Sequence, residues 1–147
     1  MLIKTFGSAV QGVNAYTITI EVSVSAGTKY FLVGLPDNAV KEGEQRIESA
    51  LKQYGYKIPR QKIVINMAPA DIRKEGAAYD LTIAMGVLAA SGQMDADKVA
   101  DYMIMGELSL DGSLRPVKGC CPLPYRPGKK ASKALYCPPR TPPRQPL

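Results

Sequence analysis

The chain contains no histidine and no tryptophan among its 147 residues, and its three cysteines all lie after residue 119. Without histidine, the imidazole that most often serves as a base or metal ligand is missing, so any general base has to be a carboxylate, a lysine or a cysteine. Cys120 and Cys121 are adjacent and Cys137 is distant, which does not match the paired Cys-x-x-Cys spacing of a zinc site. The sequence therefore predicts no metal site.

Long hydrophobic runs are also absent. No stretch reaches the roughly 18 consecutive apolar residues of a membrane-spanning helix. The first residues, 1–6, lack the apolar core and the small-residue cleavage site of a signal peptide. With 46% hydrophobic residues, the composition is typical of a single globular domain. We expect a cytoplasmic protein without a membrane partner.

Acidic residues are missing from the last part of the chain. Residues 1–119 contain 13 Lys plus Arg and 13 Asp plus Glu, whereas residues 120–147 contain six basic residues, no acidic residue and eight of the 12 prolines. Proline prevents a long helix or a central strand. We therefore predict a folded domain at 1–119, followed by a basic, proline-rich and poorly folded tail at 120–147. The whole net charge of +6 belongs to this tail.

Two origins are open for the tail. It is either a natural proline-rich linker or the product of a truncation or reading-frame change near Gly119. We favour the second origin, because a shifted frame can encode an amphipathic helix followed by an apolar strand. On that interpretation the lysines and arginines of the tail are no evidence for nucleic-acid binding.

The hydrophobic period changes along residues 1–119. Alternation from Tyr16 to Ser25 predicts a strand with one buried face, with Tyr30–Val33 as its hairpin partner and Ile3–Phe6 as a short first strand. Apolar residues at helical spacing predict a helix from Val40 to Tyr54, starting at Asp37 or Asn38. The other expected elements are a buried strand at Lys62–Met67, a buried helix at Leu81–Ala90, and a hairpin of Tyr102–Leu110 with Leu114–Val117. Strands interrupted by two helices predict an α+β fold, arranged as an α/β sandwich.

Four ordered segments carry a family pattern. They are residues 33–42 (VGLPDNAVKE), 66–76 (NMAPADIRKEG), 79–84 (YDLTIA) and 105–112 (MGELSLDG). Together they resemble the N-terminal domain of magnesium-chelatase-like (ComM/YifB) AAA+ proteins, over essentially all of residues 1–119. The resemblance implies the fold of ribosomal protein S5 domain 2, as in the Lon proteolytic domain. It also implies that an AAA+ ATPase module follows, in hexameric motors that act on branched DNA during natural transformation.

The phosphate-binding loop of an ATPase is absent from this sequence. Such a loop needs the pattern Gly-x-x-x-x-Gly-Lys-Ser/Thr, and no segment has it. We therefore expect no ATP hydrolysis and no cofactor in this chain, with ATP and Mg²⁺ bound only by the ATPase module. The expected partners are that module, neighbouring subunits and, through the assembled motor, DNA.

The catalytic pair of a Lon-like peptidase is missing as well. Such an enzyme needs a serine nucleophile activated by a lysine. By resemblance to Lon-type enzymes, the serine position is Ala78, after the Lys-Glu-Gly stretch at 74–76, and the lysine position is Cys121. A methyl group has no oxygen to attack a carbonyl carbon. Ala78 and Cys121 are therefore vestigial positions, and no catalytic residue is expected.

A charged cluster around a loop and a helix start is the candidate interaction surface. It comprises Asp71, Arg73, Lys74, Glu75 and Asp80. The functional interpretation is a contact with the ATPase module, a neighbouring subunit or DNA. The plainer alternative is that Asp80 caps the helix and the other side chains are solvated loop residues.

Three functions are compatible with these patterns. The leading one is a non-catalytic accessory domain of a magnesium-chelatase-like ATPase, with an implied role in DNA processing. The alternatives are a divergent Lon-like serine peptidase domain and a free-standing nucleic-acid-binding module. The missing serine and lysine argue against the peptidase, and the balanced charge of residues 1–119 argues against the nucleic-acid-binding module.

Overall fold

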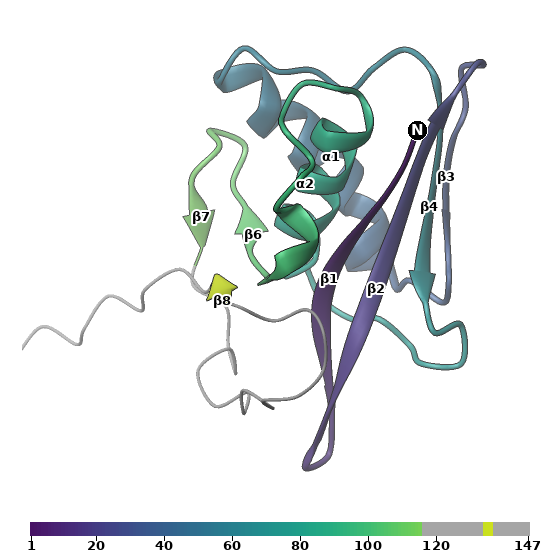
Figure 1. Cartoon of the computed structure of the whole chain (residues 1–147). Coiled ribbons are helices and arrows are strands. Elements are labelled where there is room, and N and C mark those ends of the chain that lie inside the picture. Colours follow the sequence, from purple (N-terminus) through teal and green to yellow (C-terminus); the bar gives the residue numbers. More distant parts are fainter. Residues whose placement is uncertain (116–133, 137–147) are drawn as a thin grey trace, which may run out of the picture.

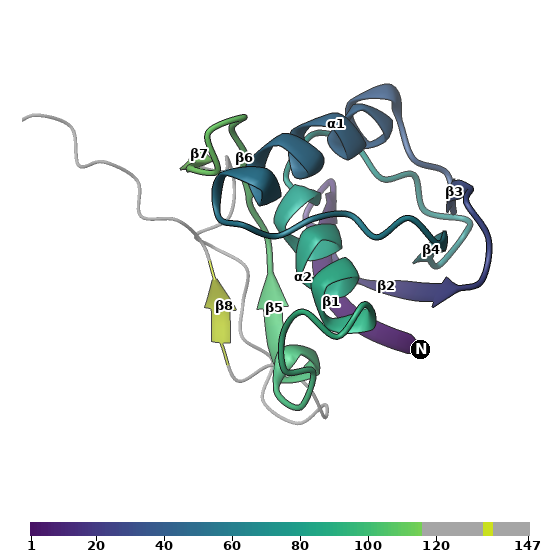
Figure 2. The same cartoon turned by 90° about the horizontal axis from the view of Figure 1, so that it is seen from above.

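The computed structural model describes residues 1–115 and 134–136 and has two layers, a mixed β-sheet with two helices packed on one of its faces (Figures 1 and 2). The elements are, in chain order, β1 (Leu2–Gln11), β2 (Asn14–Ser25), β3 (Tyr30–Val33), α1 (Asn38–Gln53), β4 (Lys62–Ala68), α2 (Asp80–Ala90), the 3-10 turn η1 (Val99–Asp101), β5 (Tyr102–Ile104), β6 (Glu107–Leu108), β7 (Leu114–Arg115) and β8 (Ala134–Tyr136). A mixed sheet with two helices confirms the predicted α+β class.

The large sheet has the strand order β3-β4-β2-β1-β5-β8. β1 and β2 form one long antiparallel hairpin, whereas β3 pairs in parallel with β4. The expectation that Tyr30–Val33 is the hairpin partner of β2 is therefore wrong. The reason is that parallel neighbours need a crossover, and α1 supplies it between β3 and β4, which leaves β4 to pair with β2. An alternating pattern identifies a buried face but does not identify the neighbouring strand.

The core lies between the sheet and the helices. Ile18, Ile20 and Val22 of β2 are completely buried, as the alternation predicts. α2 lies over β1 and β2, and nine of its 11 residues are buried. Gly86 allows this close approach, because a Cβ atom at that position would lie 2.7 Å from Cγ2 of Val22. The predicted burial of α2 on most of its sides is confirmed.

Helix α1 begins where the sequence predicts. The Asp37 side chain caps it by accepting a hydrogen bond of 2.8 Å from the Val40 amide. Among the described residues, no helix is both long enough and apolar enough to cross a membrane.

The predicted hairpin of Tyr102–Leu110 with Leu114–Val117 is present in a shorter form. β5 joins the large sheet beside β1, and the two-residue strands β6 and β7 form the small hairpin on their own. β8 extends the sheet at the edge, in parallel with β5. It lies within the tail that we expected to be poorly folded, and the rest of that tail is outside the described residues.

Candidate interaction site

Two loops meet at the carboxyl ends of the parallel strands β3 and β4. One loop, residues 34–37, leads from β3 into α1, and the other, residues 69–76, follows β4 on the way to α2. Parallel pairing brings the two strand ends to the same edge of the sheet. A bridge between Pro36 and Lys74 joins the loops. We refer to residues 34–37 and 69–76 as the paired loops.

Lys74 holds the paired loops together from the inside. Its side chain is completely buried, and its Nζ donates hydrogen bonds to the carbonyl oxygens of Gly34, at 2.6 Å, and of Pro69. Its backbone amide donates to the Leu35 carbonyl at 3.1 Å, and its carbonyl accepts from the Asp37 amide at 3.0 Å. Burial lowers the pKa of Lys74, an effect that nearby Asp71 partly offsets. Lys74 is therefore a structural cation.

Asp37 gives a second connection between the paired loops. While one carboxylate oxygen caps α1, the other accepts a hydrogen bond of 3.0 Å from the Gly76 amide. Gly34 has a φ of +103°, and a Cβ atom there would lie 2.1 Å from the Met67 carbonyl oxygen. Glycine is thus required at this point of the turn, for its backbone conformation and for the space it leaves.

The outer side of the paired loops presents the large apolar side chain of Leu35 and three charged side chains. Leu35 is 54% exposed and has a φ of +58°, an uncommon and strained conformation for a residue with a side chain. Arg73 and Glu75 are exposed and form an ion pair with an N–O distance of 3.3 Å. Asp71 is exposed as well. The contacts of Lys74 and Asp37 hold these exposed groups on a fixed backbone.

Asp80, at the start of α2, is buried in a contact between the two helices. Its carboxylate accepts two hydrogen bonds from the Arg46 guanidinium of α1, at 2.7 and 3.0 Å, and one of 3.2 Å from the Leu108 amide of β6. Arg46 also donates to the Ala39 carbonyl at 2.6 Å. Gly43 makes room for the pair, because a Cβ atom there would lie 2.6 Å from Oδ1 of Asp80. Asp80 thereby links α1, α2 and the small hairpin.

The electrostatics of this pair combine burial and a close opposite charge. Burial raises the pKa of the Asp80 carboxyl, although the hydrogen bonds from Arg46 and Leu108 act in the opposite direction. The hydrogen bond with Asp80 in turn raises the pKa of Arg46. The two parallel N–H···O bonds are the geometry of a charge-assisted pair.

The structure divides the predicted surface cluster into two groups. Asp71, Arg73 and Glu75 are exposed, whereas Lys74 and Asp80 are buried and cannot touch a partner directly. The surface role expected for Lys74 and Asp80 is therefore corrected to an internal one. The plainer alternative for Asp80 is wrong too, since the N-cap residue of α2 is Tyr79 and no side chain caps that helix.

The position aligned with a Lon-type serine lies near the start of α2. Ala78 is partly buried, and its carbonyl accepts a hydrogen bond of 2.7 Å from the Gly106 amide. The other aligned position, Cys121, lies outside the described residues. Within residues 1–115 and 134–136, no group of three or more Asp, Glu or Cys side chains could hold a metal ion.

Sequence reasoning missed the roles of Leu35 and Arg46. Nothing in the helical spacing distinguishes Arg46 from the other charged residues of α1, and charged residues are usually solvated. One signal was available in Gly43, a small residue one turn earlier on α1 that indicates a close helix contact. For the exposed Leu35 the sequence carried no signal.

Comparisons with known proteins agree on one family. The family model described as subunit ChlI of Mg-chelatase matches residues 20–141. The chain is 51% identical over 112 residues to the protein YifB of Escherichia coli, a match that covers 76% of this chain and 22% of YifB. It is 47% identical over 118 residues to the competence protein ComM of Haemophilus influenzae, covering 80% of this chain and 23% of ComM. A protein of Mycobacterium tuberculosis is 34% identical over 120 residues. The chain thus spans less than a quarter of the length of these relatives.

Replacing Asp80 by alanine should destabilise the domain strongly. The change removes the buried anion that binds the mostly buried guanidinium of Arg46, and breaking such a pair on one side costs on the order of 3 kcal/mol in the free energy of unfolding. Urea unfolding followed by circular dichroism measures the loss. Glu42→Ala is the matched control, because Glu42 is 71% exposed and lies 3.9 Å from the same arginine. The control should be nearly neutral, and equal effects of the two substitutions would contradict the role of Asp80.

Replacing Lys74 by methionine should loosen the paired loops. Met fills a similar volume but cannot donate to the carbonyls of Gly34 and Pro69, and the Pro69 carbonyl keeps only the long 3.4 Å hydrogen bond from the Ile72 amide. The loss should cost about 2 kcal/mol in the free energy of unfolding. Hydrogen exchange of the amides in residues 34–37 should accelerate at the same time. The neighbouring exposed substitution Arg73→Met should change neither quantity. Unchanged hydrogen exchange in Lys74→Met would contradict the role of Lys74 in holding the paired loops together.

Tyr79 should make the fold sensitive to alkaline pH. Its hydroxyl donates to the Ser8 carbonyl, and burial raises its pKa to about 12. Tyrosine in the unfolded chain ionises near pH 10, so the stabilisation is complete below about pH 10 and is lost as the pH rises towards 12. The slope of unfolding free energy against pH should be smaller in Tyr79→Phe. Equal slopes in the wild-type chain and in Tyr79→Phe would contradict this role of Tyr79.

Proposed function

Because this chain belongs to the family of Mg-chelatase subunit ChlI, with ComM and YifB among its relatives, we propose that it is a non-catalytic accessory domain of a magnesium-chelatase-like AAA+ ATPase. Its task is to contact the ATPase module, which carries ATP and Mg²⁺. The fold we assign to it is that of ribosomal protein S5 domain 2, as in the Lon proteolytic domain. The family membership and the mixed sheet under two helices support this assignment.

The observation that carries the proposal is the set of hydrogen bonds that the Lys74 ammonium makes. A catalytic lysine needs a nucleophile within hydrogen-bonding distance, whereas the ammonium of Lys74 is directed at two backbone carbonyls. The most deeply buried cation of the candidate site therefore fixes a backbone shape. That shape presents Leu35, Arg73 and Glu75 to the outside, as expected of a surface that recognises another protein.

The wider role follows from the family. The H. influenzae relative is named a competence protein, and we propose that the assembled motor processes DNA during natural transformation. DNA contact is assigned to the whole motor, because residues 1–119 carry equal numbers of basic and acidic side chains.

A binding experiment tests the proposal. The chain is mixed with the part of E. coli YifB that lies outside the match, and the dissociation constant is measured by isothermal titration calorimetry. Arg73→Glu should weaken binding about tenfold, because the reversal breaks the exposed ion pair with Glu75 and changes the charge of the contact surface. Lys98→Glu changes the net charge by the same amount on exposed surface after α2 and should leave the affinity unchanged.

Two results would contradict the accessory role. One is the absence of binding between the wild-type chain and the YifB part. The other is ATP hydrolysis by the chain alone, or specific labelling of the chain by a serine-reactive fluorophosphonate, since either reaction requires a catalytic site in this domain.

A further inference from the structure

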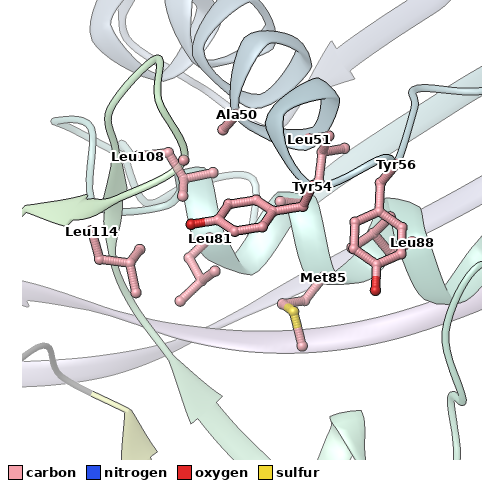
Figure 3. A pocket seen from close by; sticks show the side chains of 11 residues that line it. Ala50, Leu51, Tyr54, Tyr56, Leu81, Met85, Leu88, Leu108 and Leu114 are labelled. Carbon is pink, nitrogen blue, oxygen red and sulfur yellow. The ribbon is translucent and has the colours of Figure 1, made fainter.

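An apolar groove lies on the helical side of the domain, and Figure 3 shows the side chains that line it. It runs between the end of α1, the side of α2 and the β6–β7 hairpin, and its volume is about 180 Å³. The groove is lined mainly by Leu51, Tyr54, Leu81, Met85, Leu108 and Leu114. None of these side chains is charged, and none belongs to the paired loops.

The walls of the groove are only partly covered. Leu81 and Met85 are the two residues of α2 that are only partly buried, and both line the groove. Leu114 is half-buried, and the rings at the rim, Tyr54 and Tyr56, are 65% and 41% exposed. Apolar surface left in water is unfavourable relative to apolar surface that is buried. A partly uncovered groove of this kind is typical of a contact with another protein segment.

One wall has a specific construction. The Tyr54 ring lies directly against Gly112 in the β6–β7 turn, where a Cβ atom would be 2.2 Å from Cε2 of the ring. Gly112 has a φ of +86°, so both the conformation and the space require glycine. The turn therefore admits the aromatic ring as a wall of the groove.

The size and chemistry of the groove indicate its occupant. A volume of 180 Å³ is below the roughly 300 Å³ at which small-molecule pockets begin, and apolar groups dominate the lining. One or two inserted aliphatic side chains fit both facts. An amphipathic helix presents such side chains at neighbouring positions along one stripe.

The source of that helix follows from the path of the chain. β7 ends at Arg115, directly after the lining residue Leu114, so the polypeptide leaves the small hairpin at the rim of the groove. The match covers only 22% of YifB, and most of that relative therefore lies outside this domain.

We propose that the groove receives one or two apolar side chains of an amphipathic helix from the ATPase part of the full-length protein. The inference rests on the proposed accessory function and adds an apolar anchor to the charged contact of the paired loops. Buried apolar anchors surrounded by polar contacts are the usual arrangement at specific interfaces.

The first test uses the same YifB part and the same calorimetric titration. Leu114→Lys places a charge in the groove and should weaken binding at least about tenfold. Val10→Lys is the matched control, because Val10 is 59% exposed near the far end of the β1–β2 hairpin and should leave the affinity within about twofold. Thermal unfolding by circular dichroism verifies that both variants are folded.

The second test leaves the groove intact. The chain is labelled with ¹³C at its methionine methyl groups, and the Met85 resonance is assigned from the spectrum of Met85→Leu. Addition of the unlabelled YifB part should shift the Met85 resonance, because the inserted side chains contact it. This readout does not depend on the stability of a substituted domain.

The outcomes separate the two proposals. If the wild-type chain does not bind the YifB part, both the accessory function and the proposed role of the groove are contradicted. Binding that Leu114→Lys leaves intact, with an unshifted Met85 resonance, contradicts the groove alone. A Met85 shift that grows with the concentration of the chain itself, together with a dimer in sedimentation, assigns the groove to a second copy and overturns the proposal.

Discussion

One buried carboxylate determines how the helical layer is assembled. Asp80 at the start of α2 binds Arg46 of α1 through two hydrogen bonds and the backbone of β6 through a third. Because the pair is buried, each charge depends on the other for its solvation. Gly43 lets the two helices approach closely enough for these bonds. The same contact sets the distance between α1, α2 and the small hairpin, and these three elements are the walls of the apolar groove.

Lys74 is a second buried charge, and it connects the paired loops as Asp80 connects the two helices. Lys74 has no carboxylate in its hydrogen-bonding shell among the described residues and is satisfied by backbone carbonyls. Because its ammonium is bound to backbone carbonyls, Lys74 stabilises the backbone of the paired loops and is not directed at a nucleophile. It supports the strained conformation of Leu35 and the position of the exposed Arg73–Glu75 pair. Both buried charges thus stabilise the backbone of the domain, and the exposed groups of the paired loops are those that we propose for recognition.

The two proposed contact surfaces complement each other physically. Charged groups at the paired loops favour encounter, orientation and the choice of partner. Apolar insertion into the groove supplies affinity, since it removes hydrophobic surface from water. In YifB and ComM, more than three quarters of the polypeptide lies outside the matched part, and the partner that we propose belongs to that remainder. Affinity between two such parts benefits from the covalent link as well.

The sequence by itself determined the α+β class, β2, both helices and the start of α1 at Asp37 or Asn38, because these depend on periodicity and on contacts a few residues apart. It also determined the family, since four ordered motifs are preserved together. Only the tertiary structure decided that β4 lies between β3 and β2, that Lys74 and Asp80 are buried, and that Arg46 pairs across 34 residues of chain. The physical reason is that a charged residue has the same local signature on a solvated loop and inside a core. Its role depends on partners that folding brings from distant positions.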